Sequence, residues 1–101
     1  MKLEKKTGIQ LISEERQRQV EKEGWTPEHD DQHFCDELAT AGAVYALPER
    51  QRESQWPKST PKLWPWDSEW YKPTPDDRIK ELAKAGALIA AEIDRLNSLD
   101  R

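Results

Sequence analysis

A ten-residue segment occurs twice in this chain and restricts how the chain can fold. Residues 37–46 read ELATAGAVYA and residues 81–90 read ELAKAGALIA, so seven of the ten positions are identical. Each copy follows a Thr-Pro pair, at Thr26 and at Thr74, and Pro is favoured at the first position of a helix. Both copies are therefore predicted to be helices that pack closely through Ala and Gly, either within one chain or between chains.

The spacing of the apolar residues predicts three helices and an all-α fold. We expect the helices over about residues 8–23, 27–47 and 75–97. The third has one apolar stripe, which predicts an amphipathic helix. Its members are Ile79, Leu82, Ala83, Gly86, Ile89, Ile93 and Leu96. The 101 residues are thus predicted to form a single helical domain, a three-helix bundle.

A long loop, residues 48–74, joins the second and third predicted helices. It contains four of the five Trp residues of the chain, and its prolines exclude a helix or a central strand. Loops of this length are usually functional or disordered. Because prolines reduce the entropy that a loop loses on ordering, we predict an ordered Trp- and Pro-rich loop that lays its rings over the helices.

Composition argues against several classes of protein. Sixteen Lys and Arg against twenty Asp and Glu give a net charge of −4, which argues against broad nucleic-acid binding. No apolar run approaches the ~20 residues of a membrane span, and the N-terminus lacks the apolar segment of a secretory signal. The single Cys35 suits a reducing cytoplasm. A core this small favours a homo-oligomer.

Two histidines and a glutamate lie at helical spacing in the second predicted helix. His29, His33 and Glu37 occupy positions i, i+4 and i+8, which puts them on one face if a single helix carries all three. Imidazole and carboxylate groups one turn apart can share zinc, manganese or iron. One interpretation is a metal site, with His33 and Glu37 as catalytic candidates. The other is an acidic helix start whose histidines pair locally.

Basic and aromatic side chains suggest a site for a phosphorylated ligand. Arg16 and Arg18 are candidates to hold phosphate, because guanidinium groups bind its oxygens in pairs. Trp rings can stack on a base, and Trp25 alone lies beside the His- and acid-rich segment. The candidate ligand contacts are Arg16, Arg18, Trp25, Asp30, Trp64 and Trp66. A charged helix surface and a loop packed on a small core would explain the same residues without a ligand.

Four segments resemble a family of small tailed-phage and prophage proteins. They are ERQRQ at 15–19, EGWTPEHDDQH at 23–33, WPWDSEWYKP at 64–73 and KAGALIAAEIDRL at 84–96. The resemblance covers nearly the whole chain and implies a phage accessory protein in the cytoplasm of a bacterial host. That family has no established activity, so the resemblance does not identify a catalytic residue.

The chain also resembles, less closely, the MazG-like all-α nucleotide pyrophosphohydrolases. That family carries Glu-Glu-x-x-Glu on one helix and Glu-x-x-Asp on a second, which together bind magnesium beside a nucleotide triphosphate. Here Glu14-Glu15 is followed by Arg18, and Glu37 is followed by Thr40, so neither motif is complete. The resemblance implies a helical bundle with acidic residues facing a nucleotide site.

These features predict a phage accessory protein that binds a nucleotide or another phosphorylated small molecule. The protein would either sequester a host-defence signalling nucleotide or hydrolyse a nucleotide, and a divalent metal ion is its candidate cofactor. The alternative is a protein-interaction module that inhibits a host-defence enzyme, because Trp and Tyr are common interface anchors.

Overall fold

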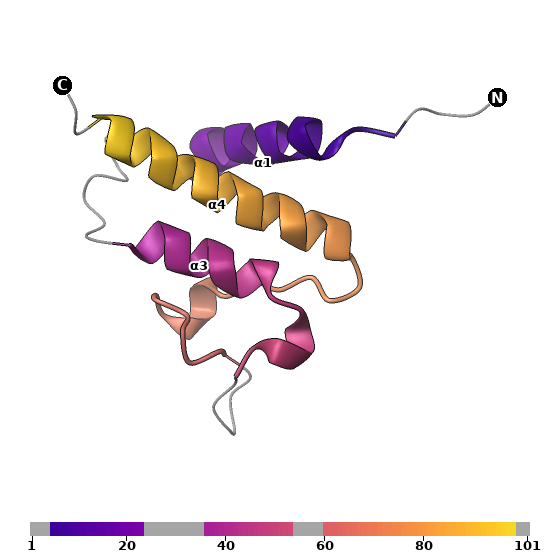
Figure 1. Cartoon of the computed structure of the whole chain (residues 1–101), viewed down its shortest axis with the longest axis vertical. Coiled ribbons are helices and arrows are strands. Elements are labelled where there is room, and N and C mark those ends of the chain that lie inside the picture. Colours follow the sequence, from indigo (N-terminus) through magenta and orange to yellow (C-terminus); the bar gives the residue numbers. More distant parts are fainter. Residues whose placement is uncertain (1–4, 24–35, 54–59, 99–101) are drawn as a thin grey trace.

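The computed structural model describes residues 5–23, 36–53 and 60–98, which form three α-helices and no strand (Figure 1). The helices are α1 (Gly8–Glu23), α3 (Glu37–Ala46) and α4 (Arg78–Ser98), with short 3-10 helices η1 (Glu49–Gln51) and η2 (Ser68–Trp70). The all-α prediction is thus confirmed for this part of the chain. No helix within it is long and apolar enough to cross a membrane.

Side-chain hydrogen bonds explain where α1 and α4 begin. Thr7 Oγ1 accepts a hydrogen bond from the Gln10 N–H at 3.2 Å, and Gln10 Oε1 accepts one from the Thr7 N–H at 2.7 Å. This reciprocal pair is a capping box, which a Thr and a Gln three residues apart can form. At α4, Asp77 Oδ1 accepts a hydrogen bond from the Lys80 N–H at 3.1 Å. Asp77 is therefore the cap, and α4 begins three residues after the predicted residue 75.

α3 is shorter than the helix predicted over residues 27–47. It begins at Glu37, after Asp36, whose φ of −107° and ψ of 25° lie outside the α-helical region. It ends at Ala46, because the next residue is extended and Pro48 follows it. Residues 27–35 of the predicted helix lie outside the described ranges.

α4 lies between the other two helices and holds the fold together. It packs against α3 on one side and against α1 on the other, so the three helices lie side by side (Figure 1). α1 and α4 run in the same direction, and α3 runs opposite to them (Figure 1). The molecule is flat, with principal extents of 47, 40 and 20 Å.

The two glycines of the sequence repeat make different helix contacts. A Cβ atom on Gly42 would lie 3.1 Å from the carbonyl oxygen of Ala85 and 3.2 Å from Ile89 Cγ1, so this glycine lets α3 approach α4 closely. A Cβ atom on Gly86 would lie 2.6 Å from Ile12 Cγ1. Close packing of the repeat within the chain is thus observed, but the second glycine faces α1 rather than α3.

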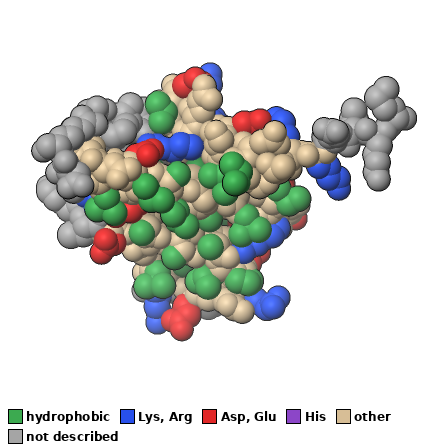
Figure 2. Space-filling view, turned by 45° about the horizontal axis from the view of Figure 1, so that its top comes forward, with side chains coloured by type: hydrophobic (Ala, Val, Ile, Leu, Met, Phe, Trp, Pro, Cys, Tyr) green, Lys and Arg blue, Asp and Glu red, His purple; other side chains and the backbone are tan. Residues whose placement is uncertain are grey.

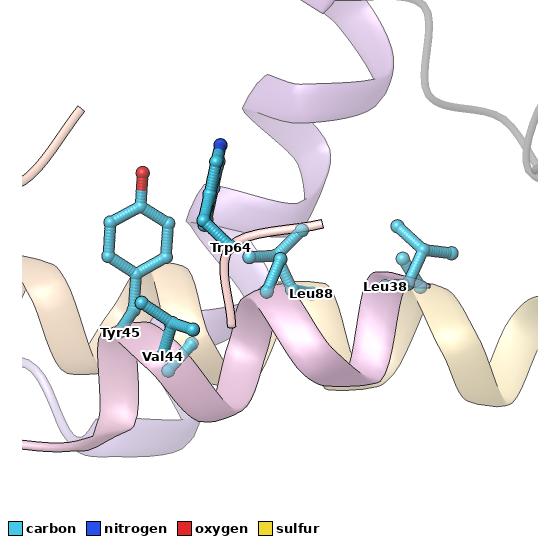
Figure 3. Close-up of a cluster of buried hydrophobic side chains, with 8 residues drawn as sticks. Leu38, Val44, Tyr45, Trp64 and Leu88 are labelled. Carbon is cyan, nitrogen blue, oxygen red and sulfur yellow. The ribbon is translucent and has the colours of Figure 1, made fainter. Parts of the chain in front are cut away.

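The hydrophobic core lies between α3 and α4 and includes the ring of Trp64 (Figure 3). Its buried residues are Leu38, Ala41, Val44, Tyr45, Trp64, Ala85, Leu88 and Ala91. The ring of Tyr45 meets that of Trp64 edge to face at 5.3 Å and stacks on Tyr71 at 5.8 Å. Residues 54–59 are not described, so an ordered loop over the whole of residues 48–74 stays a prediction.

Two arginines cap the C-terminal end of α3. Arg52 Nη2 donates to the carbonyl oxygens of Tyr45 and Leu47 at 3.0 and 2.8 Å. Arg78 Nη1 donates to the same two oxygens at 2.8 and 3.2 Å. Positive charge at this end of a helix also complements the helix dipole. Both arginines contact the carboxylate of Glu81, so this cap joins α3 to the first turn of α4.

Candidate functional site

A groove between α1 and the N-terminal half of α4 is a candidate binding site. Its volume is about 370 Å³, which is within the range of small-molecule sites. It is lined by the apolar Leu11, Ile79 and Ala83, the acidic Glu14, Glu15 and Asp77, and the basic Arg18 and Lys80. We call it the α1–α4 groove.

Glu15 holds the guanidinium group of Arg18 at this groove. Arg18 Nε donates to Glu15 Oε1 at 2.9 Å, and Arg18 Nη2 donates to Glu15 Oε2 at 2.7 Å, which makes a bidentate pair. Burial alone raises the pKa of Glu15, but the hydrogen bonds and the charge of Arg18, with a hydrogen bond from Gln19, outweigh it. The net pKa of Glu15 is lowered, so the carboxylate stays ionised and orients Arg18.

Lys84 brings a third cation close to Arg18 and Lys80. Burial lowers the pKa of Lys84, and the positive charges of Lys80 and Arg18 lower it further, while Glu15 opposes the shift. Lys84 Nζ donates to the carbonyl oxygen of Lys72 at 2.5 Å. Lys84 Nζ also lies 5.3 Å from the centre of the Tyr45 ring, so Lys84 does not line the groove, whereas Arg18 and Lys80 do.

Arg16, the other predicted phosphate ligand, does not line the groove. Its Nη2 lies 3.3 Å from Asp94 Oδ2, so it joins α1 to the C-terminal half of α4. Of the two arginines that we expected at the ligand, the structure therefore brings only Arg18 to the groove. The charge pattern does not distinguish the two arginines, because both lie on the same charged helix.

Both described Trp candidates for ligand contact belong to the core region. Trp64 is 8% exposed. Trp66 packs against it edge to face, with ring centres 5.4 Å apart. Neither ring lines the α1–α4 groove. The physical reason is that α3 contributes mainly small side chains, so large rings from the loop complete the core.

Glu37 is the one predicted metal ligand that the structure describes. It lies partly exposed in the first turn of α3. The spacing argument assumed a helix through residue 36, and the conformation of Asp36 interrupts that helix just before Glu37. In residues 5–23, 36–53 and 60–98, no three His, Cys, Asp or Glu side chains are grouped so that they could hold a metal ion. The predicted roles of Trp25, His29, Asp30 and His33 fall on residues outside these ranges and stay predictions.

A row of large apolar side chains on α4 is exposed, and we call it the α4 stripe. Its members are Ile79, Leu82, Ile89, Ile93 and Leu96, which are 45% to 65% exposed. An amphipathic pattern normally turns its large residues toward the core. In α4 the core instead receives Ala85, Leu88 and Ala91. Figure 2 shows a face of the molecule on which hydrophobic side chains gather, with charged side chains mostly at its border.

No protein-family model matches this chain, and no curated protein or solved structure was found to be similar to it. The two resemblances noted from the sequence therefore stay predictions. What the chain binds has to be argued from the α1–α4 groove and the α4 stripe.

Proposed function

We propose that this chain binds a nucleotide or another phosphorylated small molecule in the α1–α4 groove. The observation that carries the proposal is that Arg18 and Lys80 line a groove together with apolar side chains. Guanidinium and ammonium groups bind phosphate oxygens. The apolar side chains suit a base or a sugar ring. A small ligand with an anionic part and an apolar part matches this combination.

The acidic residues of the groove restrict which anions can bind there. Glu15 is paired with Arg18, and Glu14 accepts a hydrogen bond from Lys6 Nζ at 2.9 Å. These carboxylates would repel a long polyanion that followed the surface, but a single phosphate group could still reach Arg18 and Lys80. The groove is therefore suited to a small molecule rather than to nucleic acid, which agrees with the net charge of −4.

Thermal unfolding with a panel of nucleotides, with and without divalent ions, tests this proposal. A ligand at 100 times its Kd should stabilise the fold by about 2.7 kcal/mol. We expect a rise in Tm that is lost in Arg18→Ala and Lys80→Ala but kept in Lys62→Ala. Lys62 is a matched control because it lies on the loop, 3.9 Å from Glu53, and does not line the groove. No rise with any phosphorylated compound would overturn the proposal.

Sequestration and hydrolysis are two versions of this function. A phage accessory protein that sequesters a signalling nucleotide returns it unchanged, whereas a hydrolase releases product. Chromatography of the nucleotide after incubation distinguishes the two versions. If hydrolysis is found and His33 has its predicted catalytic role, His33→Ala should abolish turnover and leave the folded fraction unchanged.

One observation favours a second candidate function, the protein-interaction module. The α4 stripe exposes five large apolar side chains along one helix, and contiguous apolar patches often mark protein contacts. A photo-crosslinking residue at position 93, introduced in the cells that produce the protein, tests this function, with position 63 as the control. Leu63 is 64% exposed and lies off the stripe. Adducts with a protein other than this chain, formed at position 93 but not at position 63, would support the module, and their absence at position 93 would contradict it.

A further inference from the structure

We infer that two copies of this chain pack together through their α4 stripes and form a symmetric dimer. The inference concerns a partner that binding in the α1–α4 groove does not require, although the stripe and the groove share Ile79. In this inference the α4 stripe packs against a second copy of the same chain and not against an unrelated protein.

The arrangement of the helices leaves one face of α4 without a second layer. α1, α4 and α3 lie side by side when the molecule is viewed down its shortest axis (Figure 1). Domains normally bury their apolar faces between two packed layers of secondary structure. Here α1 and α3 cover two sides of α4, and the stripe lies on a third. A second copy would supply the missing layer.

The exposed area of the chain is large enough for such an interface. Its accessible surface is 7444 Å², whereas a compact monomer of 11.8 kDa exposes about 5,900 Å². The radius of gyration is 14.4 Å, against about 13 Å for a compact chain of this length. The surplus of about 1,500 Å² exceeds the ~800 Å² that each partner buries in a standard interface. Both values are totals for all 101 residues, and they show that the chain as a whole exposes more surface than one interface of standard size needs.

The pattern of the stripe is suited to pairing with itself. Positions 79, 82, 89, 93 and 96 lie three, seven, four and three residues apart, which is the heptad spacing of a helix seam that packs against another helix; Gly86, the remaining position of that pattern, contacts Ile12 of α1. None of these positions carries a charge, so two identical stripes meet without like-charge repulsion. A two-fold axis uses the same patch on both copies, so each position of the stripe contributes two buried side chains, one from each copy.

A two-fold dimer would also place the second copy beside the ligand site. Ile79 belongs to the α4 stripe and lines the α1–α4 groove. The partner would therefore lie along one edge of each groove. The dimer then carries two grooves, one in each copy.

Sedimentation equilibrium tests the inference on three forms of the full chain. We expect wild type to have twice the mass of the 11.8 kDa chain, and Ile93→Asp to have the mass of one chain. Leu63→Asp places the same charge on a side chain that is 64% exposed and lies off the stripe, and it should remain a dimer. Ile93 is 54% exposed, so the substitution leaves the monomer core intact. Far-UV circular dichroism checks that each variant is folded, and Leu96→Asp replaces Ile93→Asp if the latter is not.

Two results would overturn the inference. The first is a wild type that remains a single chain at all concentrations tested. The second is a dimer that persists in both folded stripe variants. A monomeric wild type that forms a cross-link from position 93 to a larger protein would leave the interaction module standing while removing the dimer. Ligand binding in the groove is measured separately, so its failure would not affect this result.

Discussion

Arg52 and Glu81 form a salt bridge that is almost completely buried. Arg52 Nη2 lies 2.7 Å from Glu81 Oε1, and the two side chains are 1% and 3% exposed. Glu81 Oε2 also accepts a hydrogen bond from the Thr74 N–H at 2.9 Å. One carboxylate therefore connects the arginine after η1 with the chain that leads into α4. Through Arg52, it also supports the C-terminal end of α3.

Removal of this carboxylate should strongly destabilise the fold. In Glu81→Ala the buried guanidinium of Arg52 loses its counter-ion, and such changes cost about 3–5 kcal/mol. Urea denaturation measures the loss. Glu49→Ala is the matched control, because Glu49 is exposed in η1, and it should change the free energy of unfolding by less than about 0.5 kcal/mol. Equal stability of the two variants would contradict a structural role for the bridge.

The same residue should make stability depend on pH. Burial alone raises the pKa of Glu81, but hydrogen bonds from Arg52, Thr74 and Arg78 outweigh it and hold the pKa below the ordinary value of 4.5. Because the folded-state pKa is below the unfolded one, this stabilisation is complete above pH 4.5 and is lost as pH falls through the folded-state pKa. The free energy of unfolding should therefore fall in acid. It should fall less in Glu81→Ala, and parallel pH curves would refute this assignment.

The contact between Gly86 and Ile12 should appear as coupling between two substitutions. Gly86→Ala places a Cβ atom against the Ile12 side chain, and overpacking of this kind typically costs about 1–3 kcal/mol. Ile12→Ala removes the clash, so the double variant should be more stable than the sum of the single effects predicts. Gly8→Ala is the control, because a Cβ atom there meets nothing within 4 Å. Additive effects in thermal unfolding would show that this contact is not tight.

Trp64 should be a determinant of stability. Trp64→Ala removes a ring that packs against Tyr45 and Tyr71, and a buried Trp of this kind is worth about 3–5 kcal/mol. Trp70 is 54% exposed, so Trp70→Ala should cost far less. Urea denaturation compares the two variants. If Trp64→Ala kept wild-type stability, the ring would not be a core residue.

Local features of the helices could be predicted from the sequence because their causes are local. The capping box at Thr7 and Gln10 needs only residues three apart, and the structure contains both of its hydrogen bonds. The end of α3 before Pro48 has an equally local cause. The interruption at Asp36 has no comparable signal, so the sequence predicts a continuous helix across a residue whose backbone is not helical.

The choice of packing face could not be predicted, because two faces of α4 are apolar. A period of 3.6 residues identifies the row that contains Ile89 and Ile93, but it does not show that the smaller Ala85 and Ala91 would face the core. The Ala85 face of α4 packs in the core because Gly42 lets α3 approach it closely, and the sequence of α4 alone does not contain that contact.

The candidate site could be predicted only in part, because it too depends on contacts between different helices. Arg18 was identified from its charge, but Lys80 and Lys84 become its neighbours only when α1 packs against α4. The partners Arg52 and Glu81 are 29 residues apart in sequence, and no local pattern connects them. Contacts of this kind depend on how the helices pack, and the spacing of residues within one helix does not predict that packing.

Methyl NMR gives the most direct test of ligand binding in the α1–α4 groove. The protein is titrated with the nucleotide that gives the largest rise in Tm, and the methyl resonances of Leu11, Ile79 and Leu63 are followed. Binding in the groove predicts saturable shifts for Leu11 and Ile79, which line it, and none for Leu63, which does not. Unchanged Leu11 and Ile79 resonances at saturating nucleotide would contradict the proposed site.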